Sequence, residues 1–187
     1  THLSVVDAEG NAVALTYTLN FSFGSGIFAP KAGVLLNNEM DDFSAKPGTA
    51  NAYGLIGGEA NAVAPGKRML SSMSPTLVLR DGEVFLVTGS PGGSRIITTV
   101  LQVVLNVLVH DMNIAEAHHT PRLHHQWLPD ELHLERGFPA DTLRALRAMG
   151  YRVRMERTLG AAHSVLRKDG LLRGSGDPRR AGIALGY

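Results

Sequence analysis

A strand, a glycine-rich turn and a helix in the middle of the chain constrain its fold more than any other feature. Residues 75–80 and 83–88 are predicted as strands on either side of Asp81-Gly82, a dipeptide typical of tight hairpins. The second strand runs into Gly89-Ser90-Pro91-Gly92-Gly93-Ser94, and residues 95–109 then carry the apolar density of a buried helix. A strand that feeds directly into a buried helix predicts a fold in which helices are layered on a sheet.

The rest of the chain adds strands and helices in mixed order. Residues 3–7 and 12–19 predict a second hairpin around a short glycine-containing loop. Residues 46–66 are rich in Gly, Pro, Ala and Asn without a clear period, which predicts a long mobile loop of the kind that often forms a lid. Further strands are predicted at 33–36, at 132–135 and around Val153 and Val165, and helices at 115–117 and 141–149. This order predicts the α+β class with a sheet packed on helices, and 187 residues suit one domain or half of a larger one.

Composition and charge exclude several classes of function. A hydrophobic content of 44% is that of a globular chain that can bury a core. Lys and Arg are scattered and the net charge is +1, so neither nucleic acid nor an anionic membrane is indicated as a partner. No stretch is long and apolar enough to span a bilayer. The absence of cysteine excludes disulfides and thiol catalysis, and leaves the compartment open.

The turn Pro91-Gly92-Gly93-Ser94 is the strongest local candidate for a site. Glycines let the backbone approach a ligand closely, and successive N–H groups at a helix start form an anion hole. In an acyl-transfer enzyme such a hole holds the oxyanion of the tetrahedral intermediate. A plain sharp turn explains the same residues equally well, and the spacing of a phosphate-binding P-loop is absent.

The first residue, Thr1, combines a hydroxyl with a free α-amine. An α-amine titrates at about 7.7–8.0, so near neutral pH part of it can accept the hydroxyl proton and activate the oxygen as a nucleophile. A trimmed domain edge is the alternative interpretation of this position.

Two polar clusters complement the two ends of an amino acid. Glu39, Asp41 and Asp42 follow a predicted buried strand, where carboxylates can pair with an ammonium group, although acidic runs are usually solvated. Ser71 and Ser72 offer hydroxyls to a carboxylate, although serine clusters mostly mark turns. Together they are the groups that an α-amino acid end needs.

The histidine-rich segment at 118–125 suggests a metal site only weakly. No H-E-x-x-H pattern or cysteine accompanies it, and adjacent histidines do not easily point to one ion. We therefore expect these side chains to pack and to form hydrogen bonds, and we predict no metal.

Taken together, the motifs resemble the small subunit of the γ-glutamyltranspeptidases, which are N-terminal nucleophile hydrolases. The resemblance covers nearly the whole chain. It rests on the threonine start, T-x-N at Thr18 and Asn20, N-N-x-M-D-D-F-S at 37–44, S-S-M-S-P at 71–75, G-S-P-G-G-S-R at 89–95, H-H-Q-W-L-P-D at 124–130 and D-P-R at 177–179.

The resemblance implies a four-layer αββα fold shared by two subunits that self-cleavage of one precursor produces. Residues 1–187 would be the small subunit, and the partner would be the large subunit of the same precursor. The implied substrates are γ-glutamyl donors such as glutathione or glutamine, with water, amino acids or peptides as acceptors. It also implies a periplasmic or secreted location and no metal or other cofactor.

The resemblance assigns roles to particular residues. The N-terminal threonine, Thr1, would attack the γ-glutamyl amide and form an acyl-enzyme. Thr18 would orient the nucleophile, and Gly92 and Gly93 would supply the N–H groups that bind the oxyanion. The amino and carboxyl ends of the γ-glutamyl group would be contacted by Asn20, Glu39 and Asp42, and its α-carboxylate would be bound by Ser71 and Ser72 together with an arginine of the large subunit. Tyr53 would belong to a lid at about 47–58.

The start of the chain departs from the family pattern by one residue. The family has the nucleophilic threonine, one small residue and then histidine, whereas here Thr1 directly precedes His2. Because strand side chains alternate between faces, a slip of one residue turns a side chain away from the site. Either a residue ahead of Thr1 completes the register, or Thr1 has taken the role. The alternative functions are another amidohydrolase or acylase of this superfamily and an inactive subunit.

Overall fold

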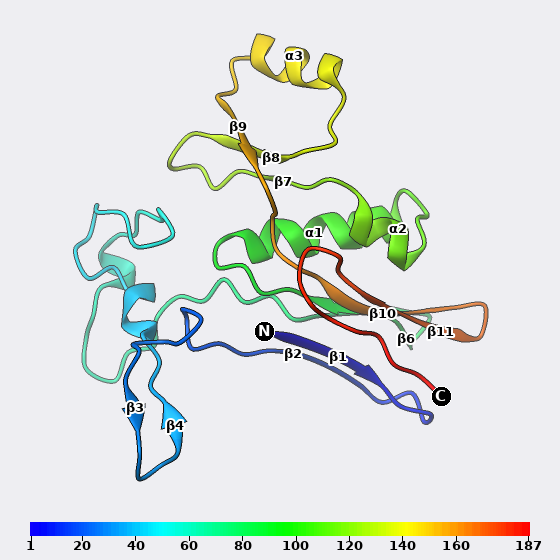
Figure 1. Ribbon diagram of the computed structural model, residues 1–187, viewed down its shortest axis with the longest axis horizontal. Helices are drawn as coiled ribbons and strands as arrows, with labels where there is room; N and C mark the ends of the chain where they lie inside the picture. Colours follow the sequence, from blue (N-terminus) through cyan, green and yellow to red (C-terminus); the bar gives the residue numbers. More distant parts are fainter.

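The computed structural model describes residues 1–187, and its centre is a four-stranded antiparallel sheet in the order β11-β10-β6-β5 (Figure 1). The bounds are Thr76–Arg80 for β5, Glu83–Gly89 for β6, His163–Lys168 for β10 and Leu171–Gly176 for β11. The hairpin predicted at 75–88 is therefore confirmed, and its second strand pairs on the other side with β10. The short turn between β10 and β11 adds an edge strand that the sequence analysis did not predict.

Two helices cover one face of this sheet (Figure 1). Helix α1 is Arg95–Leu108 and α2 is Ile114–His119, so the strand–turn–helix prediction holds. Helix α2 starts with a capping box, in which the Asn113 and Glu116 side chains each accept a hydrogen bond from the other's backbone N–H. The buried core between sheet and helices consists of Phe85, Leu86, Val103, Val107, Ile114, Ala117, Ala162 and Leu166.

The hairpin of β1 (His2–Val6) and β2 (Ala12–Thr16) packs on the opposite face of the sheet (Figure 1). Its inner face buries His2, while its outer face exposes large apolar side chains. The exposed apolar residues of that face are Leu3, Val5, Val13 and Leu15. The chain thus shows the order helices, sheet, hairpin, which is the first three layers of the expected αββα fold. No helix of the chain covers the outer face of the hairpin.

A second, three-stranded sheet has the order β7-β8-β9 (Figure 1). Its elements are β7 (Leu123–His124), β8 (Leu132–Glu135), α3 (Ala140–Ala148) and β9 (Val153–Glu156). Strands β8 and β9 are parallel, and α3 makes the crossover that a parallel pair requires. The prediction of two closing strands around Val153 and Val165 is right in position. The two strands nevertheless lie in different sheets.

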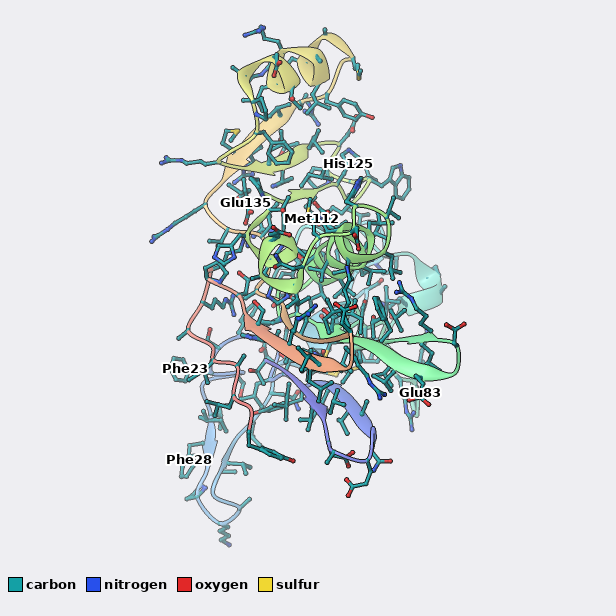
Figure 2. All side chains as sticks on the ribbon, turned by 90° about the vertical axis from the view of Figure 1, so that its right-hand side faces the viewer. Phe23, Phe28, Glu83, Met112, His125 and Glu135 are labelled. Carbon is teal, nitrogen blue, oxygen red and sulfur yellow. The ribbon has the colours of Figure 1, made fainter.

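The segment between β2 and β5 contains little regular structure. It has a short two-stranded arm, β3 (Phe28–Ala29) with β4 (Val34–Leu35), and two 3-10 turns, η1 (Glu39–Asp42) and η2 (Glu59–Asn61). The strand predicted at 33–36 is therefore present in shortened form. Figure 2 shows Phe28 on the arm, which projects from the body of the molecule. The predicted loop at 46–66 is irregular apart from η2 and two isolated bridges, which pair Ala50 with Ile56 and Ala62 with Ser44.

A buried charge network joins α2, β8 and the C-terminal segment. Asp177 accepts hydrogen bonds from Arg122 at 2.6 Å and from the Ala162 backbone N–H at 2.8 Å. Arg179 donates to the Glu135 Oε1 carboxylate oxygen at 2.6 Å. Figure 2 places Glu135 between the three-stranded sheet and the helices. Since buried charges are tolerated only when paired, this network holds the two sheets in a fixed arrangement.

Two buried histidines give the fold a pH dependence. Burial is the largest cause that lowers the pKa of His2 and of His118 to about 4. An unfolded histidine titrates near 6.5, so between about pH 6.5 and 4 the unfolded state binds protons that the folded state does not. The free energy of unfolding therefore falls with falling pH in this window, by up to about 1.4 kcal/mol per pH unit for each histidine.

This expectation is checked by urea unfolding at about pH 7.5, 6 and 5. The His118→Gln variant should show a shallower loss of stability toward acid pH than the unchanged protein. His119→Gln, at the exposed neighbouring position, is the matched control. Equal slopes for all three proteins would contradict the assignment of the pH dependence to His118.

Candidate functional site

A cleft of about 870 Å³ lies where the two β layers end. The strand pairing explains this position. His2 pairs with Thr16, so β1 starts where β2 ends, and Thr76 pairs with Thr88, so β5 starts where β6 ends. These four strand ends lie at one end of the two β layers. The predicted site residues that line the cleft are Thr1, Thr18, Asn20, Asp42, Tyr53, Ser71, Ser72, Gly92 and Gly93. Glu39 does not line it and contacts Asp42 instead.

The carboxyl groups of Glu39 and Asp42 form a close acidic pair on η1. Burial is the largest cause that raises the pKa of Glu39. The negative charge of Asp42 raises this pKa further, and so does a side-chain hydrogen bond that protonated Glu39 donates to Asp42. Burial also raises the pKa of Asp42. The Glu39 Oε1 atom is buried without a hydrogen-bond partner. A group with positive charge and N–H donors would satisfy both carboxylates, which is the property of an ammonium.

The two serines stand on the irregular segment that leads into β5. Ser71 Oγ accepts a hydrogen bond from the Met73 backbone N–H at 3.2 Å, as in a serine turn. The Ser72 hydroxyl makes no side-chain hydrogen bond, and only its carbonyl oxygen is engaged, by Ser74 Oγ at 3.1 Å. Both serines face the same cleft as Asp42. The turn interpretation therefore applies to Ser71, and both hydroxyls remain positioned to donate to a carboxylate.

Gly92 and Gly93 require the conformations that only glycine adopts easily. Their φ angles are 148° and 59°. A Cβ atom on Gly93 would lie 2.5 Å from the Tyr53 ring, so this residue of the predicted lid packs directly on the backbone of the turn. Neither backbone N–H donates a hydrogen bond within the chain. Two free N–H groups in a cleft, next to a helix start, are suited to an oxyanion.

Thr1 lines the cleft and continues the pairing of β1 with β2. Its α-amine donates to the Tyr17 carbonyl oxygen at 2.8 Å, and its own carbonyl accepts from the Tyr17 N–H at 3.1 Å. Burial, followed by the charge of Arg180, lowers the pKa of this amine. A lowered pKa favours the neutral amine, the form that accepts a proton from a hydroxyl.

His2 fixes the side-chain register at the start of β1. Its ring points to the inner face, where Nδ1 lies 2.7 Å from Thr16 Oγ1 and Nε2 lies 3.0 Å from Ser4 Oγ. The ring also packs on Gly89, at the end of β6, where a Cβ atom would collide with it. Thr1 therefore starts the alternation on the opposite face from His2.

Thr18 and Asn20 form a local turn at the edge of the cleft. The Thr18 hydroxyl accepts from the Asn20 N–H at 2.8 Å, and it makes no hydrogen bond to Thr1. Asn20 has a φ of 70°, and its side-chain amide donates to the Asn38 carbonyl at 3.2 Å. The Tyr53 hydroxyl donates to the Asn20 carbonyl at 3.3 Å. Asn20 thus joins the acidic segment to the lid.

Several other residues line the cleft without a role predicted from the sequence: Arg95, His124, Gln126, His133, Arg154, Thr158 and Arg180. Gln126 belongs to the H-H-Q-W-L-P-D motif and Arg180 follows D-P-R, so motif position was the available signal for both. Arg95 and His124 also lie within quoted motifs, whereas His133 and Arg154 come from β8 and β9 and Thr158 from the segment after β9, and only packing shows that these three share the cleft.

The histidines of segment 118–125 have separate partners. His118 Nε2 lies 2.9 Å from Ser164 Oγ in the core, and His119 contacts the carbonyl of its own helix. His124 Nδ1 lies 2.8 Å from Thr98 Oγ1, and His125 Nε2 lies 3.0 Å from Asp130. No group of three or more His, Asp or Glu side chains is arranged to hold a metal ion. None of the helices has the length and apolar character needed to cross a membrane.

Comparison with known proteins identifies the family. The family model described as gamma-glutamyltranspeptidase matches residues 1–187. The glutathione hydrolase proenzyme of Escherichia coli K12 is 62% identical over 180 residues, which are 96% of this chain and 31% of the relative. The chain spans about a third of the length of the curated relatives it matches.

Solved structures agree with this relationship. A mutant gamma-glutamyltranspeptidase of Helicobacter pylori is 57% identical, with a TM-score of 0.92 over 96% of this chain and 100% of that chain. The Pseudomonas nitroreducens gamma-glutamyltranspeptidase complexed with L-DON is 46% identical, with a TM-score of 0.94 over 100% of this chain and 99% of that one. With the matched motifs, layers and cleft, these relationships show that the chain belongs to the gamma-glutamyltranspeptidase family.

Proposed function

We propose that the protein transfers γ-glutamyl groups from donors such as glutathione to water or to the amine of an amino acid or peptide. One observation carries the proposal: a single cleft is lined by Asp42, which Glu39 contacts from behind, by the two serines and by Gly92 and Gly93, whose N–H groups are free. These are binding groups for an ammonium, a carboxylate and an oxyanion. A γ-glutamyl amide presents the first two, and develops the third when it is attacked.

The proposed reaction has two halves. The threonine hydroxyl attacks the γ-carbonyl carbon while its proton passes to the α-amine, and the resulting oxyanion is held by the glycine N–H groups. The C–N bond then breaks, and the departing amine takes the proton from the α-amine, which leaves a γ-glutamyl ester. Water or an acceptor amine attacks this ester by the same route and restores the hydroxyl.

Roles follow from the geometry of the cleft. Asp42, supported by Glu39, would bind the donor ammonium together with Asn20, and Ser71 and Ser72 would bind the α-carboxylate. Tyr53 would cover the bound donor. Thr18 would orient the nucleophile, which is Thr1 or a residue directly ahead of it.

The proposed partner is a large subunit cleaved from the same precursor. The uncovered apolar face of the β1–β2 hairpin supports this, because a contiguous patch of exposed large apolar side chains is typical of a surface that another chain covers. The relatives are proenzymes about three times as long, which leaves ample chain for that partner. We further propose a periplasmic or secreted location, on the basis of the family alone.

The first experiment is labelling of the processed protein with diazo-norleucine, a glutamine-like electrophile, followed by intact mass and N-terminal sequencing. One adduct per catalytic site on the terminal threonine is the expected result. An adduct on a residue ahead of Thr1 would restore the family register, and an adduct on Thr1 would show that the strand is shortened. Absence of any adduct would contradict the enzyme proposal in favour of an inactive subunit.

Substrate choice separates the proposed activity from that of a general acylase. A γ-glutamyl anilide and the matching glutaryl anilide differ only in the α-ammonium group. The proposal predicts strong preference for the first. Equal cleavage of both would contradict recognition of the amino acid end.

A further inference from the structure

Gln126 makes four hydrogen bonds at the wall of the cleft, and they reach three separate segments. Its Nε2 donates to the Tyr53 carbonyl at 3.3 Å and to the Leu128 carbonyl at 3.1 Å. Its Oε1 accepts from Ser94 Oγ at 2.8 Å and lies 2.9 Å from His124 Nε2. Two carbonyls can only accept, so the amide nitrogen must face them and the orientation of the side chain is determined.

The attachment of Gln126 to helix α1 is rigid. His124 Nε2 must donate to Gln126 Oε1, because an amide oxygen only accepts, and Nδ1 is then free to accept from Thr98 Oγ1 at 2.8 Å. Burial lowers the pKa of His124, which keeps the ring in this neutral form. The glutamine amide is therefore fixed to the first turns of α1 through two side chains, Ser94 and His124.

Ser94 stands at the boundary between the oxyanion turn and α1. A serine here ordinarily caps the helix by accepting from a backbone N–H, but no such cap is present. Its hydroxyl donates to Gln126 instead, and it is buried. The position of the Gly92-Gly93 backbone is thus tied directly to Gln126.

The other arm of Gln126 holds the lid. Its amide reaches the carbonyl of Tyr53, whose ring packs on Gly93 and whose hydroxyl donates to the Asn20 carbonyl. The hydrogen bond from Gln126 Nε2 to the Tyr53 carbonyl therefore links the lid backbone, through Gln126 and Ser94, to the glycine turn. The packing of the Tyr53 ring on Gly93 is a second, apolar contact between them. Asn51 holds the internal turn of this segment through its Oδ1 atom, and its side-chain amide donates to the Asp41 carbonyl at 3.5 Å, so that contact reaches the acidic segment and not the glycine turn.

We propose that Gln126 is a positioning residue that latches the lid at Tyr53 to the oxyanion turn at Ser94, so that lid closure and the placement of the Gly92 and Gly93 N–H groups are set together. This role rests on the proposed function of the cleft. Gln126 itself is not assigned a contact with the substrate.

The test uses the processed two-subunit protein and the variant Gln126→Met, which keeps the length and volume but removes all four hydrogen bonds. Loss of two neutral hydrogen bonds to the lid and turn is expected to raise KM for a γ-glutamyl anilide by roughly tenfold or more, with a smaller change in kcat. Hydrogen exchange of the lid amides at 51–55, measured without substrate, should accelerate by a similar factor.

A matched control is available on helix α1. Gln102 also bonds three backbone groups, the Thr98 carbonyl at 2.7 Å and the Leu123 carbonyl and N–H at 2.8 and 2.9 Å, but it reaches neither the lid nor the turn. Gln102→Met should leave KM and lid exchange within about twofold of the unchanged protein.

The outcomes separate this inference from the proposed function. If Gln126→Met and Gln102→Met give the same KM and the same lid exchange, Gln126 is an ordinary structural residue and the latch is overturned. Lid exchange needs no turnover, so it reports on the latch even if the unchanged protein cleaves no γ-glutamyl substrate. Faster lid exchange with Gln126→Glu as well would support the latch, because a carboxylate repels the Tyr53 and Leu128 carbonyls.

Discussion

Asp42→Asn is expected to lower kcat/KM for a γ-glutamyl anilide by on the order of 100-fold or more. The substitution keeps the shape but removes the negative charge that is proposed to pair with the donor ammonium, and a charge-assisted bond in a partly desolvated cleft is among the strongest single contacts. Burial raises the pKa of Asp42, which shows that its surroundings solvate this charge poorly. Steady-state kinetics with the processed protein measures the effect.

The matching control is the substrate rather than a second variant. A glutaryl anilide has no ammonium, so its slower cleavage by the unchanged protein should be affected little by Asp42→Asn. The preference between the two anilides should therefore collapse. A loss of equal size on both substrates would mean that Asp42 supports the fold of the cleft and not recognition of the amino acid end.

Asp177→Ala is expected to cost about 3–5 kcal/mol of the free energy of unfolding. The substitution leaves the Arg122 guanidinium buried without its partner, and the two side chains are only 2% and 0% exposed. Burial alone would raise the pKa of Asp177, but Arg122 and the backbone N–H donors outweigh it, and the pKa is lowered. This stabilisation is thus present above the unfolded pKa near 3.9 and is lost as pH falls through the lower folded value.

Urea unfolding of the processed protein measures this loss. Asp169→Ala is the control, since Asp169 is exposed and its ion pair with Arg173, at 3.4 Å, is a surface pair worth at most about 1 kcal/mol. If Asp177→Ala leaves no folded protein, Asp177→Asn can be measured instead, because it keeps a hydrogen-bond acceptor. Its free energy of unfolding should lie below that of Asp169→Ala. A cost for Asp177→Ala no larger than that for Asp169→Ala would show that the buried network does not hold the fold.

Local signals predicted most of the elements, and non-local pairing accounts for the errors. The hairpin at 75–88 is predicted by the residues of its tight turn, and the helix from Arg95 by its continuous apolar sequence. Both signals lie within a few neighbouring residues. Strand β11 is rich in glycine and leucine and its place is set by pairing with β10. The predicted strand–helix–strand order at 132–153 is present, but the parallel pairing of β8 with β9 across α3 was not predicted from it.

The site was predictable as residue types and not as contacts. Asp42, Ser72 and Gly93 were proposed because their chemistry complements an amino acid amide, and the structure places them in one cleft. Gln126 was quoted within a motif but given no function, because a glutamine has no distinctive chemistry until its four partners are known. Sequence separation explains the omission, since Tyr53 and Ser94 lie far from Gln126 along the chain.

The acidic pair also links donor binding to proton balance. Burial, and then the charge of Asp42, raise the pKa of Glu39, so this carboxyl keeps its proton to a higher pH than an ordinary glutamate does. An ammonium brought between the carboxyls would favour their charged forms and expel that proton into the buffer. Under the proposed function, donor affinity would then weaken as the medium acidifies.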